Sequence, residues 1–261
     1  MTTTLIRRAG VLALIAATTT TLTGCTGVLG ARMTYNDVEQ SKITEIVLSG
    51  GSGDVIITTA AVQQTTIKRV IRRSSNPSES YRLTGTTLNV DTSCGPDCSV
   101  SYEIQAPAGV AVRGQLRSAD IGLDGVGATD VQLTSGNVMV RNPTGPVQVH
   151  STSGDVDVIN AKGAVTVKAT SGNVQAISAG GKVDVSTTSG DVDVKLTAAN
   201  SVRAEATSGN VSLILPLGTY NISTDTASGN ASLHGLTSDP TAKNVIEVRT
   251  RSGDVDVAAA A

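Results

Sequence analysis

The chain repeats one short phrase at nearly constant spacing, and this repeat constrains the fold more than any other feature. The phrase is Ser-Gly-Asp/Asn-Val, and five copies begin at positions 135, 153, 171, 189 and 208, which are 18, 18, 18 and 19 residues apart. Weaker copies begin at positions 52, 118, 228 and 252. A fixed period of this size is typical of stacked repeat folds, in which each unit is stable only against its neighbours.

One unit, residues 152–169, contains two short stretches in which every second residue is apolar. Such alternation places these side chains on one face of a strand. A single coil cannot bury that face, but coils stacked at about 4.8 Å can, because each strand then pairs in parallel with its copy in the next coil. The sequence therefore predicts an all-β fold, a β-solenoid with about 18 residues per coil. We expect Val167 to point into the interior between Val149 and Val185, and Thr166 to point to solvent.

The composition agrees with a thin interior. The chain has four Tyr and no Phe or Trp, so Val, Ala, Leu and Ile must fill its core. The lack of aromatic side chains also argues against platforms that stack nucleic-acid bases. The net charge is −2, so no strong attraction to nucleic acid is expected.

The first 24 residues are typical of an export signal. Arg7 and Arg8 are followed by an apolar stretch, residues 9–17, that is too short to cross a bilayer. The sequence Leu22-Thr23-Gly24-Cys25 resembles the lipobox of bacterial lipoproteins. This resemblance implies cleavage before Cys25, a lipid on its sulfur, and a protein anchored to the bacterial cell membrane that faces the exterior or the periplasm. The alternatives are an ordinary secretory signal with an incidental Cys and a twin-arginine export route.

Three further segments follow the signal. Residues 25–40 are small and polar and are interpreted as a flexible tether. Residues 41–109 form an N-terminal β region, in which 87–90 and 99–105 are expected to be a strand pair joined by a cysteine-containing loop. Residues 110–261 are expected to be the solenoid repeats.

That loop contains two cysteines, Cys94 and Cys98, around Gly-Pro-Asp. We expect a disulfide between them, because an exported protein meets an oxidising compartment. A metal pair is the alternative, although zinc needs four ligands and no second Cys or His pair stands at suitable spacing. The spacing differs from that of a redox Cys-x-x-Cys motif.

The residue after each repeat glycine is acidic or an amide, and the two largely alternate along the chain. In a stack these residues form a column, where interposed Asn would separate the carboxylates and could donate hydrogen bonds along it. The members are Asp120, Asn137, Asp155, Asn173, Asp191, Asn210, Asn230 and Asp254. The favoured interpretation is structural: a turn column in which charge is spread out.

Two chemical interpretations of this column remain open. Residues 50–54, Gly-Gly-Ser-Gly-Asp, are similar to a calcium β-roll repeat, but the other corner of each coil lacks an acid. Asp155 and Asp157 could alternatively serve two-carboxylate chemistry on a polysaccharide, although the same pair recurs in other coils. His150 and His234 are the only histidines, and both are interpreted as surface residues.

The run from Tyr102 to Gly109, followed by serial Ser-Gly-Asp/Asn-Val units, resembles the bacterial putative-adhesin family, a domain of unknown function built of β-strand repeats and often preceded by lipoprotein signals. The resemblance covers about residues 43–257. It implies a right-handed single-stranded β-helix exposed on the cell envelope, and it transfers no catalytic residues. We therefore expect a non-enzymatic envelope lipoprotein without a cofactor, which offers a binding or scaffolding surface to an envelope or extracellular ligand. The alternative is a calcium-binding β-roll or a polysaccharide-acting enzyme that uses the Asp columns.

Overall fold

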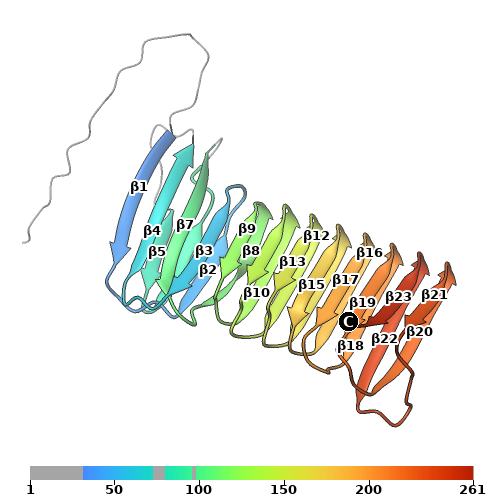
Figure 1. Cartoon of the computed structure of the whole chain (residues 1–261). Coiled ribbons are helices and arrows are strands. Elements are labelled where there is room, and N and C mark those ends of the chain that lie inside the picture. Colours follow the sequence, from blue (N-terminus) through green and yellow to red (C-terminus); the bar gives the residue numbers. More distant parts are fainter. Residues whose placement is uncertain (1–31, 73–79, 96–97, 261) are drawn as a thin grey trace, which may run out of the picture.

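The fold is all-β and consists of two long sheets that face each other. The computed structural model describes residues 32–72, 80–95 and 98–260, and no helix occurs among them. Strands from the two sheets alternate along most of the chain, so the molecule is a stack of flattened coils (Figure 1). No described segment is a helix long and apolar enough to cross a membrane.

Sheet A contains twelve strands. In spatial order they are β1 (Arg32–Glu39), β4 (Thr65–Arg72), β7 (Ser99–Pro107), β3 (Val55–Ala60), β9 (Ile121–Asp124), β11 (Val138–Arg141), β13 (Val156–Ile159), β15 (Val174–Ala179), β17 (Val192–Leu196), β19 (Val211–Leu215), β23 (Val255–Ala259) and β21 (Ala231–His234). Sheet B contains eleven strands, and its order begins at the end where sheet A finishes. They are β20 (Tyr220–Ser228), β22 (Asn244–Ser252), β18 (Val202–Ser208), β16 (Val183–Ser189), β14 (Val165–Ser171), β12 (Val147–Ser153), β10 (Thr129–Ser135), β8 (Ala111–Ser118), β2 (Glu45–Ser49), β6 (Thr87–Asp91) and β5 (Tyr81–Thr84).

The strands of neighbouring repeats pair in parallel and in register. Val149 of β12 pairs with Val167 of β14, which pairs with Val185 of β16. Each step is 18 residues in the sequence, so equivalent repeat positions stack directly on one another. Stacking of the repeat, which was predicted from its period, is confirmed for these coils.

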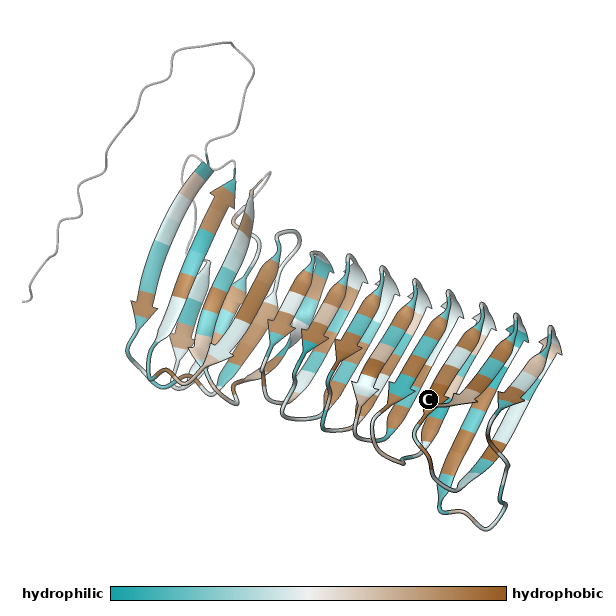
Figure 2. Ribbon diagram, viewed as in Figure 1, coloured by the Kyte–Doolittle hydropathy of each residue, from teal (hydrophilic) through white to brown (hydrophobic). Residues whose placement is uncertain are grey.

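The core is a thin layer of small aliphatic side chains between the sheets. Val149, Val167 and Val185 are each 0% exposed, as predicted, whereas Thr166 between two inward residues is half-buried on the outer face. Hydrophobic and hydrophilic residues alternate along the strands of both sheets (Figure 2). Burying one Val stabilises by about 1.5–3 kcal/mol, and columns of Val repeat this gain in every coil.

The corner after each Ser requires glycine for two reasons. Gly154 and Gly172 have φ of 114° and 126°, a conformation that side chains disfavour. A Cβ on Gly172 would also lie 2.2 Å from the carbonyl oxygen of Gly154 in the adjacent coil. The repeated Gly therefore allows two backbones to approach at the corner.

The N-terminal region differs from the prediction in three respects. The predicted tether includes β1, which pairs antiparallel with β4 over its whole length, so the tether assignment is wrong for residues 32–39. The strands β6 and β7 lie in different sheets and are consecutive sides of one coil, so the predicted strand pair is wrong. Both sheets also run without a break across the predicted boundary at 109/110, because β2 and β3 pair with β8 and β9.

The two ends of the stack do not follow chain order. At the N-terminal end, β2 and β3 lie between the β6–β7 coil and the β8–β9 coil, although they precede both coils in the chain. At the C-terminal end, the last strands, β22 and β23, lie between the β18–β19 coil and the β20–β21 coil. The last described strand, β23, therefore lies one coil inside the stack, and β20 and β21 form the final edge of the described part (Figure 1).

Candidate binding face

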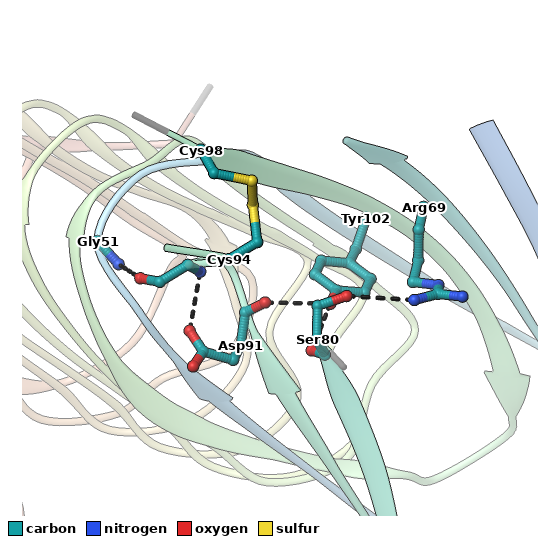
Figure 3. The surroundings of a disulfide bond; sticks show 8 residues. Gly51, Arg69, Ser80, Asp91, Cys94, Cys98 and Tyr102 are labelled. Atoms are coloured by element: carbon teal, nitrogen blue, oxygen red, sulfur yellow. Dashed lines mark hydrogen bonds between the residues drawn. A yellow bond between two sulfur atoms is a disulfide. The ribbon is translucent and has the colours of Figure 1, made fainter. Parts of the chain in front are cut away.

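The structure describes two of the three cysteines that were predicted as site residues. Cys25 lies outside the described residues. Cys94 and Cys98 are joined by a disulfide with Cα atoms 5.2 Å apart, at the corner between β6 and β7 (Figure 3). Both cysteines are buried, so this bond belongs to the interior of the corner.

A buried tyrosine supports the same corner (Figure 3). The hydroxyl of Tyr102 lies within hydrogen-bond distance of the backbone carbonyl of Ser80 and 3.0 Å from that of Asp91. Burial raises the pKa of Tyr102, so the hydroxyl stays protonated and remains a donor. The hydrogen bonds connect two parts of the chain at the N-terminal end of the stack.

Arg69 binds the first strand to this end. Its guanidinium carbon lies over the rings of Tyr35 and Tyr81, at 5.0 and 4.9 Å from their centroids, and its Nη2 contacts Asp37 Oδ2 at 2.9 Å. Cation–π contacts of this kind contribute about 0.5–2 kcal/mol each. Together with Tyr102, these two tyrosines serve the N-terminal end of the fold, and sequence reasoning did not identify this cluster.

The Asp/Asn column forms a continuous hydrogen-bonded ladder. The Oδ1 of every member except Asn230, the last, accepts a hydrogen bond from the backbone N–H of the equivalent residue in the next coil, at 2.7–3.2 Å. The spatial order is Asp54, Asp120, Asn137, Asp155, Asn173, Asp191, Asn210, Asp254, Asn230. The side chains therefore act as turn supports, and the bonds run to the backbone rather than from the amide groups as expected.

The amide-to-side-chain bonds that we expected in this column occur at another corner. Asn142 Nδ2 donates to Asp124 Oδ1 at 2.9 Å, and Asn160 Nδ2 donates to Asn142 Oδ1 at 3.0 Å. Asn142 and Asn160 both have positive φ, at 50° and 58°. These ladders explain why small polar residues recur at both corners without any ligand.

The candidate catalytic acids belong to the repeat. Burial raises the pKa of Asp157, with a further contribution from Asp155. Burial also raises the pKa of Asp193, with a further contribution from Asp191, at the equivalent place two coils away. A perturbation that recurs with the repeat indicates a common local environment rather than one active site. No group of three or more His, Cys, Asp or Glu among the described residues is arranged to hold a metal ion.

The outer surface of sheet B is the candidate binding surface, because polar side chains are aligned in columns across its strands. We define the sheet B face as the outward side chains of β8, β10, β12 and β14, which form three columns across these strands. They are Arg113, Asp130, Gln148 and Thr166; Gln115, Gln132, His150 and Lys168; and Arg117, Thr134, Thr152 and Thr170. Seven of these twelve side chains are Gln or Thr, three are Arg or Lys, and Asp130 is the one acid, so polar groups follow one another at the spacing of the coils, about 4.8 Å.

The first groove on the sheet B face has a volume of about 320 Å³. Its floor includes the small side chains of Ala111, Ala128, Pro146 and Ala164. At one end Arg113 Nε donates to Glu45 Oε1 at 2.5 Å, and this hydrogen bond lowers the pKa of Glu45. The groove thus has small apolar side chains in its lining and the Arg113–Glu45 ion pair at one end.

The second groove, of about 260 Å³, lies beside the first on the same strands. It is lined mainly by polar side chains, among them Gln132, Lys168 and Thr152. His150 also lines it, and its Nε2 lies 3.4 Å from Gln148 Nε2 of the neighbouring column. His150 is thus a surface residue of this face, whereas His234 lies at the far end of the stack, 3.2 Å from Asp256 Oδ1.

Another hollow, of about 570 Å³, lies on sheet A near the N-terminal end. Its lining combines the exposed side chains of Val38 and Ile56 with the ion pair of Lys68 and Glu103 at 3.0 Å. It depends on β1 and β4, which pair antiparallel, and so does not continue along the repeats. The sheet B face is the surface that the repeat itself extends.

A stack of paired parallel strands with polar outer columns defines a class of repeat protein with broad flat faces. The Toastrack DUF4097 family matches residues 39–180 and 177–258. The chain belongs to this family, as the resemblance to the putative-adhesin repeats indicated. No curated protein matches the chain.

The chain is similar to solved bacterial structures. A protein of Bacteroides fragilis named a putative adhesin has a TM-score of 0.52 at 14% identity, with 90% of this chain and 100% of that chain covered. A putative cell adhesion protein of Clostridium sporogenes has a TM-score of 0.28 at 13% identity, with coverages of 87% and 100%. A putative adhesin of Parabacteroides distasonis has a TM-score of 0.30 at 13% identity, with coverages of 88% and 98%. At these identities the first likeness concerns the fold alone.

Proposed function

We propose that the protein is a non-enzymatic lipoprotein of the bacterial cell envelope, and that its sheet B face binds an extended polar polymer of the envelope. The observation that carries this proposal is the pair of adjacent grooves on the sheet B face. An extended ligand could follow the columns across successive coils and meet a polar side chain in each. The adhesin names of structurally similar proteins agree with a binding role.

The chemistry of the face favours a ligand rich in hydroxyl and amide groups. The columns offer both donors and acceptors, and seven of their twelve side chains are Gln or Thr, so neutral polar groups on the ligand find the most partners. Glycan strands of the cell wall combine hydroxyls with amides and are therefore the proposed class. Binding through shallow polar grooves without aromatic stacking is expected to be weak at each site and to gain strength through repetition.

The proposed location rests on the lipobox-like Leu22-Thr23-Gly24-Cys25. A diacylated or triacylated Cys25 would hold the protein on the membrane, because two or more acyl chains give stable anchoring. The Cys25→Ser variant should leave the membrane fraction and should not incorporate labelled palmitate. Unchanged membrane retention and processing of this variant would refute the anchor.

The binding role is tested with purified cell-wall sacculi and the chain from Thr26 onward, which contains every described residue. We expect the chain to sediment with sacculi and to be released by soluble wall fragments. Hydrolysis of the wall glycan by the chain would support the enzymatic alternative instead. Failure to sediment with sacculi would remove glycan strands as the ligand class.

A further inference from the structure

The C-terminal end of the stack consists of two edge strands on which a further strand could pair. We define the C-terminal edge as β20 and β21, which lie at the ends of sheets B and A and each pair with one described strand only. The sides of these strands away from β22 and β23 face along the stack axis, where another coil would lie. Ser238 and Asp239 of the same chain cover the first part of β20 on this side, through a bridge and a hydrogen bond to Tyr220, so the open part is residues 224–228 together with β21. The edge lies at the end of the stack opposite to β1 (Figure 1).

Backbone groups on this edge point away from the stack. Ile222 uses both its N–H and its carbonyl for the side chain of Ser238, at 2.9 and 3.1 Å, on the side opposite to β22. Because backbone groups of a strand alternate between its two sides, Thr224 presents its N–H and carbonyl on the same free side. In β21 the carbonyl of Asn230 accepts from Val255, so the groups of Ala231 and Leu233 face outward. Unpaired groups of this kind form a template for a further strand.

Core positions are also uncovered at this edge. Leu233 is 42% exposed, whereas the residues that stack on its position in the interior coils, Leu213 and Val257, are 0% exposed. Ala231 is exposed where Val211 and Val255 are buried. Covering these side chains would add apolar burial to the backbone pairing.

The C-terminal edge lacks the charges that usually protect a free edge. Its two strands contain one Asp and one His and no Lys, Arg or Glu. At the other end of the stack, β1 contains Arg32, Asp37 and Glu39. Charged residues on edge strands prevent pairing with other chains, so the two ends differ in this protection.

We propose that the occupant of the C-terminal edge is the C-terminal edge of a second copy of this chain. The edge offers two strands at the same level, and a single peptide could pair with only one of them. A two-fold axis perpendicular to the stack would place an antiparallel strand on both at once, as in an isologous dimer. The N-terminal end does not offer a matching surface, because sheet A extends two strands beyond the β6–β7 coil and sheet B extends one.

The consequence for adhesion rests on the proposed anchor at Cys25. The described stack is about 50 Å long, since its twelve strands in sheet A are spaced by about 4.8 Å. An N-terminal lipid would direct the C-terminal edge away from its own membrane. Tail-to-tail pairing would then join molecules on two facing membranes.

The test is sedimentation equilibrium of the chain from Thr26 onward over a concentration series. We expect a reversible monomer–dimer equilibrium that Leu233→Lys weakens at least about tenfold by placing a charge on the edge. Thr224→Pro should weaken it similarly, because it removes an N–H that no strand of the same chain uses. Ser212→Lys, an outward residue of the internal strand β19, is the matched control and should dimerise like the wild type.

Hydrogen exchange of the wild type gives a second readout that needs no variant. The amides of Ala231 and Leu233 should become protected as the protein concentration rises. A chain that remains monomeric, or exchange at these amides that does not depend on concentration, would overturn the proposal. Equal dimerisation of the wild type and both folded edge variants would do so as well.

Vesicles carrying the lipidated protein separate this proposal from the anchor. Clustering that is lost with Leu233→Lys supports tail-to-tail pairing between membranes. If the soluble chain dimerises and the vesicles bind it without clustering, the pairing stands and the membrane-bridging consequence is wrong.

Discussion

Charge introduced at adjacent residues of β14 should have very different effects on stability. Val167 is 0% exposed and stacks between Val149 and Val185, whereas Thr166 is half-buried on the outer face. Val167→Asp loses the burial of one Val, about 1.5–3 kcal/mol. It also places a carboxylate in an apolar layer, which adds several kcal/mol more or forces the acid to bind a proton. The total approaches the whole stability of an ordinary domain, about 5–15 kcal/mol.

Thr166→Asp provides the matched control. Its neighbour in the column is Asp184, and like charges directly opposite each other destabilise by up to about 1 kcal/mol. Urea unfolding of both variants, followed by circular dichroism, gives the difference, and hydrogen exchange of β12 and β16 shows whether the loss spreads to adjacent coils. Because coils support one another, we expect protection to fall in both neighbours of Val167→Asp. Similar losses of stability in the two variants would refute the alternation of inward and outward residues on which the fold rests.

Three further outcomes follow from the corners and columns. Gly172→Ala should lose at least about 3 kcal/mol of unfolding free energy in urea, because its Cβ would lie 2.2 Å from the Gly154 carbonyl oxygen. Gly85→Ala, where the added Cβ meets open space, should lose only about 1–2 kcal/mol. Equal losses would contradict the close approach at Gly172. Burial raises the pKa of Asp193, so its ionised form destabilises the fold. Asp193→Asn should therefore be more stable than the wild type by up to about 0.5 kcal/mol at pH 7, and this gain should disappear as the pH falls below the ordinary carboxyl pKa. A gain that persists at low pH would argue against burial of the charged carboxylate as its cause. The melting temperature should be the same in chelator and in millimolar calcium, since the Asp column accepts backbone hydrogen bonds, and a large increase with calcium would restore the β-roll interpretation.

The coils between β8 and β19 could be predicted from the sequence because one period governs both the corners and the inward residues. The register of Val149, Val167 and Val185 follows directly from that period. Outward columns follow as well, but the depth of the grooves on the sheet B face depends on the relative positions of side chains from several coils. The right-handed sense of the coil stays a prediction.

The sequence carries a signal for the order of the C-terminal coils. Along the chain the alternation of acid and amide fails where Asn210 is followed by Asn230. In space Asp254 lies between Asn210 and Asn230, and the alternation is restored. This arrangement keeps the carboxylates of the C-terminal coils apart, whereas Asp54 and Asp120 are neighbours at the other end of the ladder.

The N-terminal errors had a different cause. Residues 32–39 are polar and lack a strong apolar alternation, so nothing local distinguishes them from a tether. Their strand depends on distant partners, above all Arg69, which contacts Asp37 and Tyr35. Contacts between residues 32 positions apart, as for Asp37 and Arg69, are not visible in a local pattern.

The most direct test of the account compares binding by the two outer faces. His150→Glu with Lys168→Glu changes the second groove on the sheet B face, and Lys195→Glu with Ser212→Glu adds acids to the outer surface of sheet A. We expect the first pair to weaken sedimentation with cell-wall sacculi at least about tenfold, because these side chains line the groove, and the second pair to bind like the wild type. Equal binding by both double variants, or loss confined to the sheet A variant, would contradict the assignment of binding to the sheet B face.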